Sequence, residues 1–309
     1  MMRHPHAHIP RWGLLVLSLL ACQFALGQGL KSEDYTSTNA MELRVEANVT
    51  KHFKVRDQSI NVHLAQTVFS RLYESTYSQL SDATTSAQPY FRRSFTSLGV
   101  SYAPVPYLRI GAEYTLKVFG NKLKTADGTA NTPSEYLRHR ASFSLTGQYT
   151  YQNWKFSLRE RLDANIRTDS VNLHEKPQTD LLLRHKIQAQ YTIPGKPLKV
   201  YTYVELCNTL NQPVKYLNTF AGVDKDGNET AYAGKTFGQY LRLTRVQAGL
   251  RWRVDRCNTL GLAYRFTYGY SRDINIIKNN AAKKYPGYIE LTHAKSFGHY
   301  IVVTYDLDW

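Results

Sequence analysis

The sequence has no long apolar run after its first 27 residues. No later stretch contains 18 or more consecutive apolar residues, and the mean hydropathy of the 309-residue chain is −0.44. A helix needs about 20 predominantly apolar residues to cross a bilayer. The composition therefore excludes a membrane protein built from transmembrane helices.

Cysteine is scarce, with three residues in the whole chain. Cys22 lies in the N-terminal leader, which leaves Cys207 and Cys257. Cys257 falls in a turn, and Cys207 lies about nine residues along the predicted strand 198–210, which at roughly 3.3 Å per residue is too far from the level of that turn for a disulfide. We expect two free thiols.

Motifs for catalysis and for metal binding are missing. The sequence contains no Gly-x-Ser-x-Gly, no His-Glu-x-x-His and no pair of closely spaced cysteines. His139 and His185 are expected at similar depth on two predicted strands, but no serine accompanies them. We predict that the protein is not an enzyme and has no catalytic residues, no metal and no cofactor.

Acidic residues are few compared with basic ones. The chain has 24 Asp and Glu against 39 Lys and Arg, a formal net charge of +15. Such a balance indicates nucleic acid or an anionic surface as a partner. No nucleic-acid-binding motif is present, so we expect no nucleic acid and instead small anionic solutes or the lipid and lipopolysaccharide of a membrane.

The N-terminus has the features of a secretory signal peptide. Arg3 and Arg11 precede a short apolar core at 12–24, and small residues follow it at Ala25 and Gly27. We predict a signal peptide over 1–27, cleaved before Gln28, and a mature domain over 28–309. Lipoprotein processing at Cys22 is the alternative.

Alternating apolar and polar residues predict eleven strands. The expected ranges are 41–49, 60–72, 91–103, 107–119, 136–151, 154–167, 181–193, 198–210, 240–254, 260–270 and the terminal run ending at 309. Most are long enough to cross a bilayer at a tilt. Short turns alternate with long polar links, the pattern of an antiparallel transmembrane β-barrel. Single-chain bacterial barrels have an even strand number, so we expect about 12 strands (10–12), with a weak strand in 28–39 as the twelfth.

The chain ends on an amphipathic strand with an aromatic last residue. Tyr305, Leu307 and Trp309 share one parity, and Asp306 and Asp308 take the other. This ending resembles the insertion signal of outer-membrane barrels. It implies that the barrel-assembly machinery of a Gram-negative bacterium is a partner and that the outer membrane is the location.

One face of the predicted strands is rich in basic residues. The inward or rim-facing candidates are Arg138, Arg140, Arg159, Arg161, Arg184, Lys186, Arg245, Arg251 and Arg265. They indicate an anion-attracting mouth, contacts with lipopolysaccharide phosphates, or an internal ion-pair ladder with Glu113, Asp163 and Glu205.

Several hairpin segments also carry a family resemblance. Thr96–Tyr102, Tyr107–Tyr114, Arg138–Arg140 and Phe156–Arg161 resemble an uncharacterised outer-membrane β-barrel family of Bacteroidetes-type Gram-negative bacteria, the domain of unknown function numbered 2490. The resemblance covers most of residues 40–309. It implies a signal peptide, a barrel and an outer-membrane location, and it transfers no catalytic residue.

Three functions are compatible with these features. The first is a narrow or passive pore with a basic lumen. The second is a structural or surface-interaction barrel whose lumen is closed. The third is an outer-membrane lipid-modifying enzyme, for which the sequence offers the least support.

Overall fold

The computed structural model describes residues 35–55, 58–78, 81–86, 90–119, 137–167, 179–211, 221–223, 229–231, 238–277 and 288–309. The predicted signal peptide lies outside these residues. The long strands are β1 (Tyr35–Val55), β2 (Gln58–Ser78), β4 (Tyr90–Val105), β5 (Leu108–Phe119), β6 (Leu137–Tyr151), β7 (Trp154–Arg167), β8 (Thr179–Thr192), β9 (Leu198–Asn211), β12 (Tyr240–Arg253), β13 (Asn258–Ile277) and β14 (Tyr288–Asp308). Three short strands accompany them: β3 (Ser81–Ser86), β10 (Ala221–Val223) and β11 (Glu229–Ala231).

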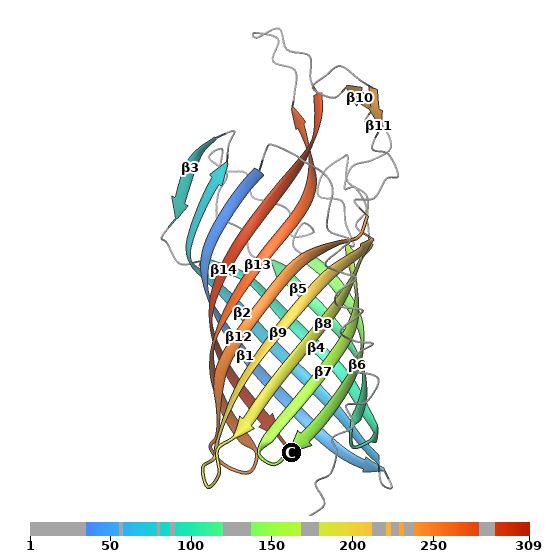
Figure 1. The fold of residues 1–309 in the computed structure, drawn as a ribbon, viewed down its shortest axis with the longest axis vertical. Helices are drawn as coiled ribbons and strands as arrows, with labels where there is room; N and C mark the ends of the chain where they lie inside the picture. Colours follow the sequence, from blue (N-terminus) through green and yellow to red (C-terminus); the bar gives the residue numbers. More distant parts are fainter. Residues whose placement is uncertain are drawn as a thin grey trace, which may run out of the picture.

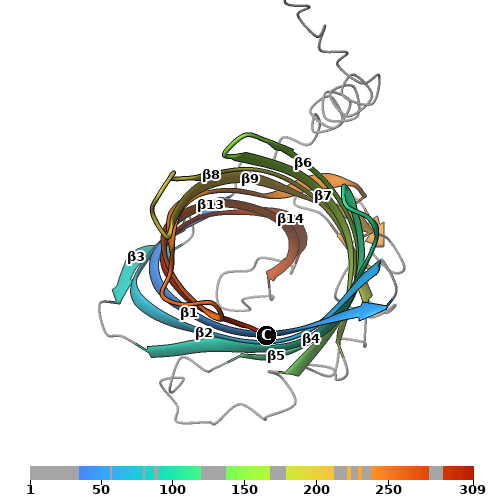
Figure 2. The same ribbon diagram turned by 90° about the horizontal axis from the view of Figure 1, so that it is seen from below.

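The eleven long strands form one closed barrel (Figures 1 and 2). Each strand pairs antiparallel with the next long strand, from β1 to β14. The ring closes where β1 pairs with β14 in parallel, from Tyr35 opposite His293 to Thr50 opposite Asp308. The predicted all-β barrel of about 12 strands is therefore confirmed as a fold.

The even strand number was wrong, and the closing pair is not antiparallel. Residues 35–39, part of the segment expected to hold a twelfth strand, are instead the beginning of β1. With eleven strands that alternate in direction, the first and the last run the same way. They can close the ring only in parallel, which uses evenly spaced, slanted hydrogen bonds.

The two ends of the barrel differ. Short connections join β4 to β5, β6 to β7, β8 to β9 and β12 to β13 at one end, which we call the turn-side rim. The long links enter the other end, the loop-side rim, above which β1, β2, β13 and β14 extend (Figure 1). The C-terminus lies at the turn-side rim (Figure 1).

Side chains alternate between the interior and the outer surface. On β2, His63, Ala65 and Thr67 line an internal cavity, whereas Val62 and Leu64 are exposed. Large exposed hydrophobic side chains occur on every one of the eleven barrel strands. A water-soluble surface rarely carries so extensive an apolar area, and a barrel of this kind is compatible with an outer-membrane location.

Aromatic side chains gather on the outer surface at the turn-side rim. Tyr149, Tyr151 and Trp154 flank the turn between β6 and β7, and Trp252 lies at the end of β12. The ring of Trp154 packs on that of Tyr191, with 4.9 Å between centroids. Amphipathic rings favour the boundary between lipid and water.

Among the described residues there is no helix whose length and hydropathy would let it cross a membrane. The described chain is built from strands and the turns between them.

The interior is mostly polar, but aromatic side chains line parts of it: Phe69, Phe95 and Phe119 form one group, and Tyr201 and Tyr203 form an aromatic wall. Tyr201 and Tyr203 on β9 pack with Ala263 on β13 and Val302 on β14. The Gln247 side chain accepts a hydrogen bond from Tyr203 (2.9 Å) and is bonded to the Tyr201 hydroxyl (2.6 Å). These contacts hold the two tyrosine rings against the inner face of the sheet.

Cys207 is buried and Cys257 lies in the turn between β12 and β13. Both are free, as the strand assignment predicted.

Candidate functional site

The barrel encloses a cavity of about 530 Å³ that is strongly basic. Thirteen Lys or Arg side chains line it, against three carboxylates, those of Glu46, Glu113 and Glu205. All nine basic residues singled out in the sequence are among the lining residues: Arg138, Arg140, Arg159, Arg161, Arg184, Lys186, Arg245, Arg251 and Arg265. Strand alternation places them inside because each has the parity opposite to the exposed apolar residues of its strand.

Glu113 on β5 is the first of three interior carboxylates that hold arginines. Its Oε1 atom accepts from Arg161 Nη2 (2.8 Å) and Arg140 Nη2 (3.3 Å). Its Oε2 atom lies 3.3 Å from His63 Nε2. Thr115 donates a further bond (3.0 Å). One carboxylate therefore orients side chains from β2, β6 and β7.

Asp163 on β7 is the second interior carboxylate and is fully buried. Its Oδ1 atom lies 2.7 Å from Arg161 Nε, and its Oδ2 atom lies 2.7 Å from Arg184 Nε. Ser142 donates to it at 2.7 Å. A buried carboxylate needs such compensation, because leaving the charge unpaired would cost several kcal/mol.

Glu205 on β9 completes the series. Arg245 Nη1 lies 2.9 Å from its carboxylate, Arg184 Nη1 lies 3.4 Å away, and Arg159 Nη2 lies 3.6 Å away. Because Arg161 and Arg184 each bridge two carboxylates, a continuous ladder of ion pairs crosses the inner wall from β5 to β12. The internal ladder was one of the three roles considered for these residues.

A second cluster of ion pairs lies around Glu42, which is 1% exposed. Arg71 Nη2 lies 2.7 Å from Glu42 Oε1, Arg93 Nη2 lies 3.6 Å from Oε2, and Arg92 also pairs with it. The sequence analysis did not identify Glu42 as the carboxylate that holds these arginines. Glu42 had the interior parity on its strand, which is the signal that could have identified it.

Several interior cations also lie over aromatic rings. Lys186 Nζ is 3.9 Å from the ring centroid of Tyr203, and the Arg251 guanidinium is 5.4 Å from that of Tyr201. Arg93 lies 4.4 Å from the centroid of Phe69. A cation over a ring face is attracted by the quadrupole of the ring, so these rings position cations without neutralising them.

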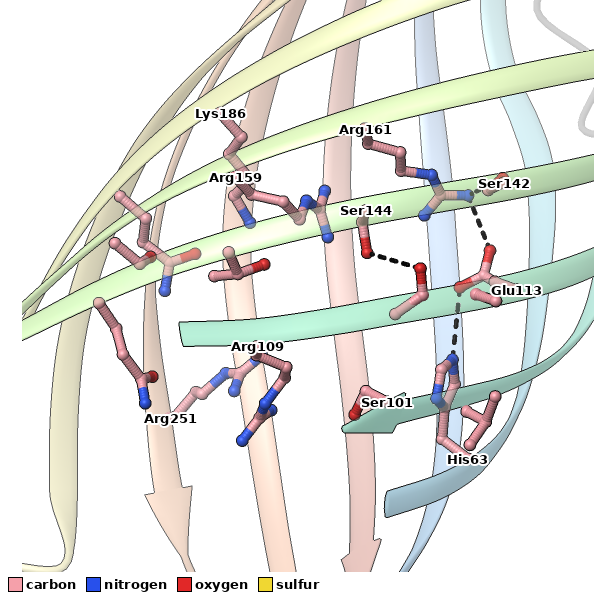
Figure 3. A pocket seen from close by; sticks show the side chains of 17 residues that line it. His63, Ser101, Arg109, Glu113, Ser142, Ser144, Arg159, Arg161, Lys186 and Arg251 are labelled. Carbon is pink, nitrogen blue, oxygen red and sulfur yellow. Dashed lines mark hydrogen bonds and ion pairs between the residues drawn. The ribbon is translucent and has the colours of Figure 1, made fainter. Parts of the chain in front are cut away.

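A second cavity, of about 440 Å³, adjoins the first and shares Arg159, Arg161, Lys186 and Arg251 with it. Figure 3 shows its lining, to which β5 adds Arg109. The remaining lining is mostly neutral, with Ser101, Ser144, Thr146, Gln148, Ser157 and Gln188. Sequence reasoning missed Arg109, although it alternates with the apolar residues Leu108 and Ile110.

His139 and His185 do not converge on a reaction centre. His139 Nδ1 is bonded to the hydroxyl of Tyr114, whereas His185 pairs with Glu160 on the neighbouring strand. The described residues include no group of three or more His, Cys, Asp or Glu side chains that could hold a metal ion.

The predicted assembly signal lies at the end of β14 on the turn-side rim. Trp309 N donates to Thr50 O (3.0 Å), and Trp309 O accepts from His52 N (2.9 Å). Tyr305 donates to Asn258 (2.6 Å), and Leu307 lies opposite Val49. The last residue therefore fixes the end of the parallel seam.

No protein-family model, curated protein or solved structure matches the chain, so its function has to be inferred from the barrel and its lumen.

Proposed function

We propose that the protein is an outer-membrane pore for small anions. The observation that carries this proposal is the composition of the internal cavity, in which thirteen cationic side chains face three carboxylates. Fixed positive charge inside a low-dielectric wall raises the local concentration of anions and repels cations. The apolar outer surface on all eleven strands supports a membrane location.

The ion-pair ladder has a defined role in such a pore. Glu113, Asp163 and Glu205 hold their arginines in fixed positions and neutralise part of their charge. An anion that entered an uncompensated basic channel would be held tightly, whereas conduction requires binding weak enough for release. Partial compensation therefore favours passage of anions over their retention.

The proposed location implies the partners. A cleaved leader over 1–27 and the terminal residues Tyr305, Leu307 and Trp309 support export and recognition by the barrel-assembly machinery. The membrane partners would be outer-membrane lipid and lipopolysaccharide of a Gram-negative bacterium. The hairpin segments resemble the domain of unknown function numbered 2490, and membership of that family remains a prediction.

Single-channel recording in planar bilayers tests the proposal. Wild-type protein should conduct, and Arg251→Gln should lower the conductance at low salt, because Arg251 lines both cavities and its nearest carboxylate, that of Asp306, is 4.0 Å away. Arg256→Gln, in the exposed turn between β12 and β13, is the matched control and should conduct like the wild type. A protein that is folded but silent at all voltages would overturn the proposal.

A structural barrel with a closed lumen is the second candidate. The continuous ladder from Glu113 to Arg245 favours it, since interlocked long side chains fill the interior of a small barrel. A silent protein that shows the mobility shift of a folded barrel on unheated gels would support this function.

A further inference from the structure

Two sets of basic residues in the lumen differ in how closely a carboxylate pairs with them. Arg140, Arg161, Arg184 and Arg245 each have a carboxylate oxygen within 3.4 Å. A second set consists of Arg109, Arg159, Lys186 and Arg251, and we call it the four-cation cluster. All four line the 440 Å³ cavity.

The four-cation cluster is poorly neutralised. The closest carboxylate oxygen to Arg159 is 3.6 Å away, on Glu205, and the closest to Arg251 is 4.0 Å away, on Asp306. Within the described part of the chain, Arg109 and Lys186 have no carboxylate within 4.0 Å. The Lys186 ammonium instead faces the ring of Tyr203.

The barrel register brings part of the cluster together. Arg109 is opposite Thr146, Thr146 is opposite Arg159, and Arg159 is opposite Lys186. One row across β5 to β8 therefore carries three cations and one hydroxyl on its inner face. Figure 3 shows these cations and Arg251 on one side of the cavity, with Glu113 and its partners on the other.

The arrangement has the chemistry of an oxyanion site. Guanidinium groups present paired N–H donors that match the oxygens of phosphate, and an ammonium adds a point charge. The neighbouring Thr146, Gln148 and Gln188 supply neutral donors for further oxygens. A single chloride ion would use few of these donors, whereas a compact multivalent oxyanion would use several of them at once.

We propose that the four-cation cluster binds a multivalent oxyanion of the phosphate or phosphoryl class inside the lumen. The site would select among the anions that enter the barrel. The inference rests on the proposed function, because the ligand reaches the cluster through the lumen.

Block of the chloride current by pyrophosphate tests the inference. Pyrophosphate should reduce the current through the wild type at concentrations at which acetate has no effect. Arg109→Gln and Arg159→Gln should each raise the half-blocking concentration about tenfold or more, since each loses a charge-assisted hydrogen bond. Arg242→Gln is the matched control, because Arg242 lines the larger cavity but not the smaller one.

The outcomes separate the two proposals. A chloride current that pyrophosphate does not reduce, or an equal loss of block in Arg242→Gln, overturns the oxyanion site and leaves the pore intact. A silent protein overturns the pore, and calorimetric titration of the detergent-solubilised wild type with pyrophosphate then decides the site. If Arg109→Gln fails to fold, Arg109→Lys keeps the charge, and weaker block in this variant supports paired guanidinium donors.

Discussion

The clearest energetic consequence of the structure concerns Asp163, the centre of the ion-pair ladder. Asp163→Asn removes the negative charge but keeps an oxygen that can accept from Ser142. Arg161 Nε and Arg184 Nε, both 2.7 Å from the native carboxylate, then lose their shared partner in a fully buried position. Removing one member of a buried ion pair destabilises a protein by about 3–5 kcal/mol.

The remaining contacts place the expected loss at the low end of that range. Arg161 keeps Glu113 at 2.8 Å, and Arg184 keeps Glu205 at 3.4 Å. We therefore expect the free energy of unfolding to fall by about 3 kcal/mol. Asp306→Asn is the matched control: its carboxylate is 4.0 Å from Arg251, the new amide oxygen can still accept from Asn48, and a loss below about 1 kcal/mol is expected.

Urea unfolding in lipid vesicles, followed by tryptophan fluorescence, measures both variants. The free energy is extrapolated from the linear dependence on urea, so the slopes must agree with that of the wild type for the comparison to hold. A loss below 1 kcal/mol for Asp163→Asn, or equal losses in the two variants, would refute the ladder as a source of stability.

Three further predictions concern the parallel seam between β1 and β14, the turn between β12 and β13, and the close contact at Gly249. Deleting Trp309 removes the backbone bonds that end the parallel seam and should reduce the fraction of folded barrel in the outer membrane, measured by the gel mobility shift; normal assembly would argue against its role as a signal. Hydrogen bonds from the Asn258 side chain and from the backbone N–H groups of Cys257 and Asn258 lower the pKa of the Asp255 carboxyl. The turn should be fully stabilised above the ordinary pKa of an aspartate. The protection of its amides relative to their intrinsic exchange rates, measured by mass spectrometry, should decrease as the pH falls through the lowered value, and Asp255→Asn should abolish this change in protection. Gly249→Ala places a Cβ atom 2.8 Å from the Leu262 carbonyl oxygen and should cost about 1–3 kcal/mol in the same urea assay, whereas an unchanged stability would show that the sheet adapts.

Residue periodicity was sufficient to predict the barrel because apolar side chains on its outer face alternate with mostly polar side chains on its inner face. The predicted range 154–167 coincides with β7, where apolar and polar residues alternate except at Glu160. The range 41–49 was too short, since β1 runs from Tyr35 to Val55. Its residues Thr36 to Asn39 are polar on both faces, so no alternation marks them as a strand.

The parallel pairing that closes the barrel was not predicted from the alternation of apolar and polar residues. Alternation indicated eleven strands, and an expectation of even numbers suggested a twelfth. Parallel pairing of β1 with β14 follows from the odd number of alternating strands, which the expectation of an even number set aside, and no local residue preference encodes it. The β14 residues opposite β1 would show the same two-faced pattern in either direction.

The sequence predicted which basic and acidic residues face the lumen, but not which arginine pairs with which carboxylate. Parity assigned Arg161 and Arg184 to the interior, and it named Asp163 and Glu205 as partners for the basic residues. It could not show that Arg161 bridges Glu113 and Asp163, because that contact depends on the stagger between β5 and β7, which are separated by β6. Such stagger becomes fixed only when the whole barrel closes.

The reversal potential of the wild-type protein in a planar bilayer under a gradient of KCl tests the central claim most directly. A cavity lined by thirteen cations and three carboxylates, with the buried Asp163 and Glu42 pairing with some of those cations, should give a reversal potential of the sign expected for chloride permeation. Its magnitude should decrease as the total salt concentration rises, because salt screens fixed charge. A reversal potential with the sign set by potassium, or a folded protein that carries no current, would contradict the account.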